Sequence, residues 1–138
     1  MWCGRRALNK ATDPGLLDNL AAGGLPADEQ PLQCASREVW EEAGLVQSVD
    51  DFSSQTQVVL TERPVAEGWH SERIFVYTLP LTHAQHPSNR DGEVSEFLCL
   101  SVKEVMHRIR SGEFTPDAAC AIAITLARNL APHAVRKS

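Results

Sequence analysis

Segment 23–45 constrains the fold of this 138-residue chain more than any other part of it. The segment begins with two glycines and carries the letters REVWEEAGL over positions 37–45. It predicts a loop followed by a helix over 31–43, because Pro31 suits the first turn of a helix. Gly44 suits the position just past the end of a helix. The fold must therefore accommodate a tight loop that leads directly into a short helix.

Three carboxylates share one face of this predicted helix. At about 100° per residue, Glu38, Glu41 and Glu42 fall within an arc of roughly 100°. Like charges at this spacing repel each other on a bare helix. A hard divalent cation that neutralises them would account for the pattern, and Mg²⁺ prefers oxygen ligands and is commonly shared with substrate phosphates. The spacing therefore predicts a Mg²⁺ site, with a solvated acidic helix face as the alternative.

The same segment resembles a complete Nudix box, the signature of hydrolases that cleave a nucleoside diphosphate linked to another moiety, and related diphosphates. The defining positions are Gly23, Glu29, Arg37, Glu38, Val39, Glu41, Glu42, Gly44 and Leu45. Further stretches resemble the Nudix domain that is linked to thiamine pyrophosphokinase in fungi, with its stand-alone plant and bacterial relatives. These stretches are residues 5–6, 10–12, 14–19, 22–24, 75–77, 89–97 and 112–116, so the resemblance covers almost the whole chain.

The resemblance implies a metal-dependent hydrolase in which water attacks phosphorus. The implied substrate is thiamine diphosphate or one of its oxidised analogues, and the product is the monophosphate. By the same resemblance, Mg²⁺ or Mn²⁺ is held by Glu38, Glu41 and Glu42 together with the backbone carbonyl of Ala22. Glu38 and Glu41 are also candidates for a direct catalytic part, and Arg37 would orient a glutamate through a charge-assisted bond.

Other positions near the box are expected to shape the site. Gly23 and Gly24 permit a tight loop and a close approach of the backbone. Glu29 is expected to support the geometry of that loop. Later in the chain, Glu93 follows a flexible turn and is a candidate for the general base. Glu96 precedes a predicted strand and is a candidate for a further metal ligand.

Substrate contacts are expected from cationic and aromatic side chains outside the box. Arg5, Arg6 and Lys10 flank the loop ahead of the box and could neutralise substrate phosphates. Each of them taken alone also fits a solvated surface charge. Trp69 could stack on a heteroaromatic ring of the substrate.

Two other functions remain open at this stage. One is an enzyme similar to isopentenyl-diphosphate isomerase, which has a related box and a basic loop before it. That class uses a cysteine in this loop, and no cysteine lies between Arg5 and Gly23. The other is a non-catalytic Nudix-like binding or regulatory module. Such modules usually lose box carboxylates, whereas this chain keeps all of them.

The remaining segments predict an α/β (α+β) fold with a mixed sheet between helices. The predicted strands are residues 1–3, 16–22, 55–60, 73–81 and 94–100, and the predicted helices are residues 31–43, 102–109 and 116–130. Residues 61–71 are expected to form a hairpin connection between two strands, and residues 82–92 to form a loop. Residues 1–131 would form one Nudix domain and residues 132–138 a frayed tail. Related folds carry a further strand ahead of Trp2, so the expected fold lacks its first strand.

Composition narrows the range of partners. The formal net charge is −5, which gives no support for nucleic-acid binding. Four scattered cysteines fit reduced thiols rather than a disulfide framework. The sequence has no apolar run of membrane-spanning length. We therefore expect a cytoplasmic protein that acts on a small-molecule diphosphate and has no membrane partner, with a homodimer kept as an option.

Overall fold

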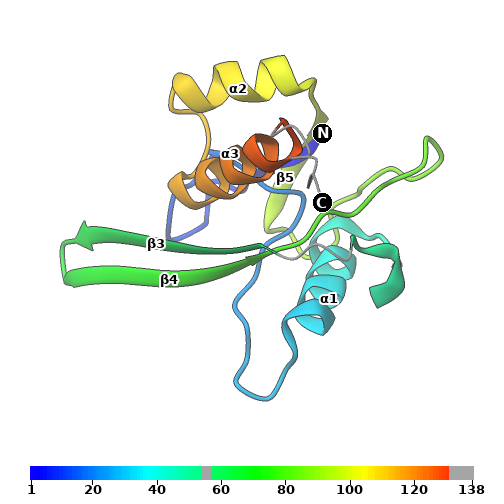
Figure 1. Ribbon diagram of the computed structural model, residues 1–138, viewed down its shortest axis with the longest axis horizontal. Coiled ribbons are helices and arrows are strands. Elements are labelled where there is room, and N and C mark those ends of the chain that lie inside the picture. The colour runs from blue at the N-terminus through cyan, green and yellow to red at the C-terminus, as the bar shows by residue number, and fades with distance from the viewer. Residues whose placement is uncertain (54–56, 131–138) are drawn as a thin grey trace, which may run out of the picture.

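The computed structural model describes residues 1–53 and 57–130. Its elements in chain order are β1 (Trp2–Arg6), β2 (Leu17–Asp18), α1 (Pro31–Ala43), the 3₁₀ turn η1 (Val49–Asp51), β3 (Gln57–Val65), β4 (Gly68–Val76), β5 (Val94–Cys99), α2 (Val102–Arg110) and α3 (Pro116–Leu130). Figure 1 shows α2 and α3 together in one part of the molecule and α1 in another, with a long β3–β4 hairpin that extends away from both. The expected α/β class is confirmed.

The strands form two separate sheets. The first has the order β2-β1-β5, and the second consists of β3 and β4 alone. All pairs between the named strands are antiparallel. Among residues 1–53 and 57–130, parallel pairing is limited to one isolated bridge between Leu17 and Phe114. The central strand β1 therefore places the N-terminal segment between β2 and the strand that follows the loop over 82–92.

Two hydrophobic clusters lie on opposite faces of the three-stranded sheet. Leu98 of β5 packs with the cluster that contains Val105 of α2 and Ile122 of α3. Its neighbour Phe97 packs with the cluster that contains Val39 of α1. Successive side chains of a strand point to opposite faces, so the sheet lies between α1 on one side and α2 with α3 on the other. This arrangement is a three-layer sandwich.

The helices begin and end where local sequence signals predict. Helix α1 has the expected bounds, and its last turn is closed by Gly44, whose N–H donates to the carbonyl of Trp40 over 3.0 Å. Ser101 and Glu104 form a capping box at the start of α2. At the start of α3, the hydroxyl of Thr115 accepts a bond of 3.2 Å from the N–H of Ala118.

Several expected strand boundaries are wrong. Strand β1 continues to Arg6 instead of ending at residue 3, because it pairs with both β2 and β5. Strands β3 and β4 run through most of residues 61–71, and only Ala66 and Glu67 connect them. Nine cross-strand partners align from Gln57–Val76 to Val65–Gly68, and this continuous pairing overrides the turn signals of proline and glycine in the segment. Strand β4 ends at Val76 instead of 81. Strand β2 has two residues, because the chain after Asp18 leaves the sheet to run beside α1.

Some expectations fall outside the described residues. These are the start of the predicted strand at 55–56, the end of the expected domain at 131, and the expected tail over 132–138. Within the described part of the chain, no helix has both the length and the apolar character needed to cross a membrane.

The end of α1 provides a test of the fold. Gly44 has a φ of 66°, and a Cβ atom at this position would lie 2.8 Å from the Ser88 hydroxyl oxygen. We expect Gly44→Ala to lower the free energy of unfolding by about 1–2 kcal/mol, because an L-residue is strained in this conformation. Denaturant unfolding measures the change.

Gly24→Ala is the matched control. No heavy atom lies within 4 Å of the position that its Cβ would occupy. Equal stability of the two variants would contradict the described end of α1.

Candidate metal and active site

The loop between β2 and α1 lies directly against the first carboxylate of the box. A Cβ atom on Gly23 would lie 2.0 Å from Cδ of Glu38 and 2.2 Å from one of its oxygens. Only glycine leaves room for the Glu38 carboxylate at this position. The Glu38 side chain is 14% exposed, and burial raises its pKa while the charge of Arg37 opposes that rise.

Arg37 holds three carboxylates at once. Its Nε and Nη2 donate to the two oxygens of Glu29 over 3.1 and 2.9 Å, which is a bidentate arrangement. Its Nη1 lies 2.8 Å from Oε2 of Glu41 and 2.7 Å from Oε1 of Glu38. The hydrogen bond from Arg37 also lowers the pKa of Glu29. One guanidinium therefore joins the loop before α1 to two box positions on α1.

Glu42 is the most buried carboxylate of the box, with 8% of the residue exposed. Its Oε2 accepts a bond of 3.0 Å from the N–H of Ala22. Burial raises the pKa of Glu42 to about 7, and the negative charges of Glu38, Glu93 and Asp91 add to this effect. A proton or a cation at this position relieves the repulsion.

A second acidic segment meets α1 at Glu42. Carboxylate oxygens of Glu42, Asp91 and Glu93 all lie within 4.8 Å of one another, so these three residues could hold a metal ion. The turn before β5 fixes this approach, because the N–H of Glu93 donates to Oδ1 of Asp91 over 2.9 Å. The N–H of Ala7, just after β1, also donates to the carbonyl of Glu93 over 2.9 Å.

Two of the three expected phosphate-binding cations lie beside this cluster. Arg6 and Lys10 line a small cavity together with Ala22, Glu42 and Glu93. Lys10 forms an ion pair with Glu93. Nη1 of Arg6 lies 3.0 Å from Oδ2 of Asp18, which lines the same cavity. The cavity thus combines two cations with carboxylates from three parts of the chain.

The structure does not bring four other expected site residues to the cluster. Arg5 and Glu96 pair with each other across β1 and β5, with 2.5 Å between Nε and Oε1. Trp69 lies opposite Pro64 near the tip of the β3–β4 hairpin, and Figure 1 shows that this tip points away from α1. Gly44 lies at the C-terminal end of α1. The catalytic and binding roles expected of these residues stay predictions.

Sequence reasoning did not single out Asp91 and Asp18 as site residues. Asp91 stands two positions before Glu93, in a turn whose sequence Asp-Gly-Glu resembles many surface turns. Its proximity to Glu42 depends on how β5 pairs with β1. Asp18 follows the buried Leu17, and burial raises its pKa although Arg6 opposes the shift. An ion pair between a half-buried aspartate and a half-buried arginine is visible only once strand register is known.

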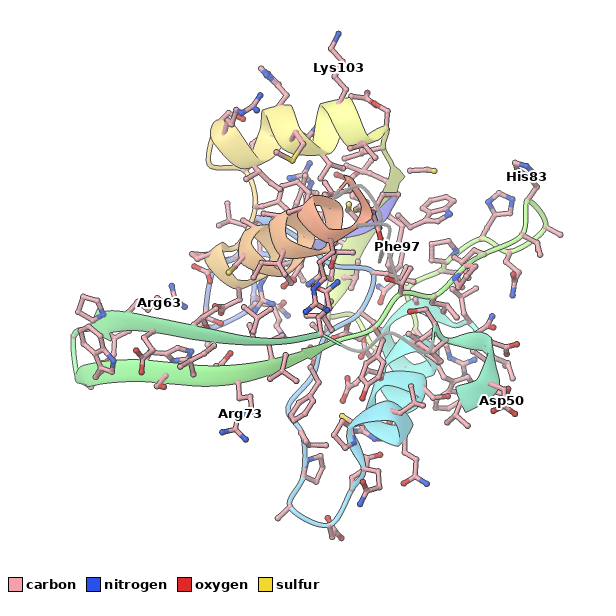
Figure 2. The ribbon with its side chains drawn as sticks, in the orientation of Figure 1. Asp50, Arg63, Arg73, His83, Phe97 and Lys103 are labelled. Carbon is pink, nitrogen blue, oxygen red and sulfur yellow. The ribbon has the colours of Figure 1, made fainter. Side chains whose placement is uncertain are left out.

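Figure 2 shows where the site lies in the molecule. Phe97 of β5 is labelled near the centre, between α3 and α1, and the turn with Asp91 and Glu93 leads into the same strand. Phe97 packs with the α1 cluster. The strand that delivers the second acidic segment is therefore held against the helix that carries the first.

Comparisons with known proteins identify the family. The family model of the NUDIX domain matches residues 1–119. Nudix hydrolase 24, chloroplastic, from Arabidopsis thaliana is 34% identical over 124 residues, which are 90% of this chain and 34% of that protein. The uncharacterized Nudix hydrolase YfcD from Escherichia coli K12 is 34% identical over 131 residues, which are 95% of this chain and 67% of that protein.

A solved structure supports the fold alone. The crystal structure of DR0079 from Deinococcus radiodurans superimposes with a TM-score of 0.67 at 23% identity, covering 89% of this chain and 72% of that one. The chain spans about a third of the length of the Arabidopsis relative. The family model over residues 1–119 and the Nudix relatives show that the chain belongs to the Nudix hydrolase family.

Proposed function

We propose that this chain hydrolyses a diphosphate linkage with the help of a divalent metal ion. One observation carries the proposal: carboxylates of Glu42, Asp91 and Glu93 converge in a cavity that Arg6 and Lys10 also line. Oxygen-rich acidic groups suit Mg²⁺ or Mn²⁺, and neighbouring cations suit phosphate oxygens. Family membership supports the same chemistry.

The residues present fit a divalent cation. The donor set consists of carboxylates, and Gly23 leaves space for the Glu38 carboxylate that a Cβ atom would fill. Burial raises the pKa of Glu42, neighbouring negative charges add to the rise, and a bound cation would offset both effects. The proposed ligands are Glu38, Glu41 and Glu42 with the carbonyl of Ala22, and the cluster around Glu42 supports adding Asp91 and Glu93. When bound, such an ion lowers the pKa of a water molecule and offsets charge on phosphate oxygens.

The side chains around the cluster would divide the remaining tasks. Arg37 would keep Glu38 and Glu41 oriented, since it already contacts both of them. Lys10 and Arg6 would draw the anionic diphosphate into the cavity. Lys10 would leave Glu93 for a phosphate oxygen, which frees the Glu93 carboxylate to bind the metal ion.

The proposed substrate class is thiamine diphosphate or its oxidised analogues, cut to the monophosphate. The support is the resemblance of segments outside the box, such as residues 14–19 and 89–97, to the Nudix domain linked to thiamine pyrophosphokinase. The expected cytoplasmic location stays a prediction. Two plant relatives carry the word chloroplastic in their names.

A screen for phosphate release tests the proposed function. Purified chain is incubated with thiamine diphosphate, its oxo analogue, ADP-ribose, nucleoside triphosphates and isopentenyl diphosphate, each with Mg²⁺, with Mn²⁺ and with chelator. We expect metal-dependent release from thiamine-type diphosphates. Isomerised isopentenyl diphosphate would favour the isomerase alternative, and absence of turnover on every compound would contradict the proposal.

Glu42→Gln separates catalysis from folding. Turnover should fall by orders of magnitude, because a proposed ligand is lost. The folded protein binds a proton at Glu42 more tightly than the unfolded chain, whose carboxyl has a pKa of about 4.5. Metal-free stability should therefore fall as pH rises from about 4.5 to 7. Glu42→Gln should flatten this pH dependence and should raise the free energy of unfolding of the metal-free protein by about 1–3 kcal/mol at higher pH.

The control for this variant is Glu67→Gln in the β3–β4 turn. It should leave both the turnover and the pH dependence of stability at the parent values. Thermal unfolding in chelator across the pH range measures the stability. A Glu42→Gln variant that keeps activity within a few-fold of the parent would rule out the ligand assignment.

Arg37→Lys tests the three-carboxylate contact. Lysine has no planar fork and cannot bind Glu29 through two parallel bonds while reaching Glu38 and Glu41. We expect activity or metal affinity to fall roughly 10–100-fold, the scale for residues that orient ligands. Arg110→Lys on α2 is the matched control. If Arg37→Lys keeps the kinetics and the metal affinity of the parent, Arg37 is a surface charge that does not orient the carboxylates.

The two late glutamates are separated by a pair of variants. Glu93 lies with Glu42 and Asp91, whereas Glu96 pairs with Arg5. We therefore expect Glu93→Gln to weaken Mg²⁺ binding and to lower the rate, and Glu96→Gln to do so much less. Calorimetric titration with Mg²⁺, beside the rates, measures both effects. The reverse order would restore Glu96 as the metal ligand and Glu93 as the mobile base.

A further inference from the structure

The β3–β4 hairpin has one face that the rest of the chain covers. Side chains of a strand pair alternate between two faces. On the covered face, Nη2 of Arg63 lies 3.9 Å from Oδ2 of Asp13. On the same face, ligating atoms of His70, Glu72 and Asp117 lie within 4.8 Å of one another, and Asp117 belongs to α3. Helix α3 and the loop after β1 therefore lie against this face.

Within the described part of the chain, the opposite face of the hairpin is largely exposed and largely apolar. Its eight residues are Val58, Leu60, Glu62, Pro64, Trp69, Ser71, Arg73 and Phe75. Val58 is 56% exposed, Leu60 63% and Trp69 65%. Figure 2 shows Arg63 and Arg73 on opposite sides of the hairpin, with Arg73 pointing away from α3. We name these eight residues the outer hairpin face.

Such a face is unusual on an isolated chain. Antiparallel sheets with one solvated side normally alternate apolar and polar residues. Here apolar residues occupy both sides, with Val59 buried on the inner face and Val58 and Leu60 exposed on the outer one. Contiguous exposed apolar surface commonly marks an interaction site. A lone two-stranded hairpin is also marginally stable in water.

The order of residues on the outer hairpin face is complementary to itself. The face consists of four cross-strand rows, which are Val58–Phe75, Leu60–Arg73, Glu62–Ser71 and Pro64–Trp69. Consider two copies packed face to face, with a two-fold axis that lies between the faces and runs across the strands. The first row of one copy then lies on the fourth row of the other, and the second row lies on the third. The apolar end rows then meet each other. The row with Arg73 of one copy meets the row with Glu62 of the other, and these two long side chains are diagonal neighbours across the contact.

We propose that the outer hairpin face is the contact surface of a homodimer in which two hairpins pack face to face. A two-fold interface requires one patch to be self-complementary, and the row order fulfils this for both apolar and charged residues. Arg73 forms no ion pair with another residue of the described chain, and Glu62 accepts a bond of 3.2 Å from the Ser71 hydroxyl. Opposite charges are thus available to a second copy, independently of the proposed chemistry.

Charge reversal in two separate chains tests the proposal. Sedimentation velocity over a concentration series should show that the parent dimerises. Glu62→Arg places arginine diagonally across from Arg73 of the second copy, and Arg73→Glu places glutamate diagonally across from Glu62 of the second copy. Each variant alone should therefore dimerise about tenfold more weakly or worse. Mixing the two variants should restore the dimer, because every cross-copy pair is then Arg with Glu.

The rescue by mixing cannot come from a contact within one chain, so it is specific to the interface. Leu60→Ser should weaken the dimer as well, and Lys103→Glu on α2, far from the hairpin in Figure 2, should not. Circular dichroism of each variant checks that the chain is folded. A parent that stays monomeric, or a dimer that is indifferent to Leu60→Ser and to the charge reversals, would overturn the proposal.

Discussion

Repulsion among crowded carboxylates is the constraint on which the rest of the site depends. Glu38 and Glu42 come from one helix, and Asp91 and Glu93 come from the turn before β5. Burial raises the pKa of Glu42, and the negative charges of Asp91 and Glu93 raise it further. A folded chain holds such a group only where cations offset it. Arg37 contacts Glu38 as well as Glu29, and Lys10 contacts Glu93. We infer that a divalent ion offsets the negative charge of the carboxylates that these side chains leave unbalanced.

The fold around the cluster is built from elements far apart in sequence. Strand β1 pairs with both β2 and β5, so the loop before α1 and the turn before β5 leave the same sheet. Phe97 and Val39 belong to one hydrophobic cluster, which fixes β5 against α1. Gly23 then admits the Glu38 carboxylate, and the N–H of Ala22 binds Glu42. Backbone packing thus positions the acids, while side-chain cations limit their repulsion.

Local features could be predicted from the sequence because their signals are local. Helix α1 has the expected bounds, and the caps at Ser101 and Thr115 are present. The proximity of Asp91 to Glu42 could not be predicted, because it depends on strand register, including an irregularity between Arg5 and Arg6. The β3–β4 hairpin was expected, but its length was missed for a similar reason, since nine cross-strand pairs outweigh the local turn preferences of Pro64 and Gly68.

Proton release on metal binding tests the central claim most directly. If Mg²⁺ binds where Glu42 is held partly protonated, binding near pH 6.5 must expel that proton. Calorimetric titration in buffers of different ionisation enthalpy should show release of up to about one proton per ion. The Glu42→Gln variant should release no proton from position 42 when it is titrated with Mg²⁺. Binding of Mg²⁺ to the parent without proton exchange would contradict the account.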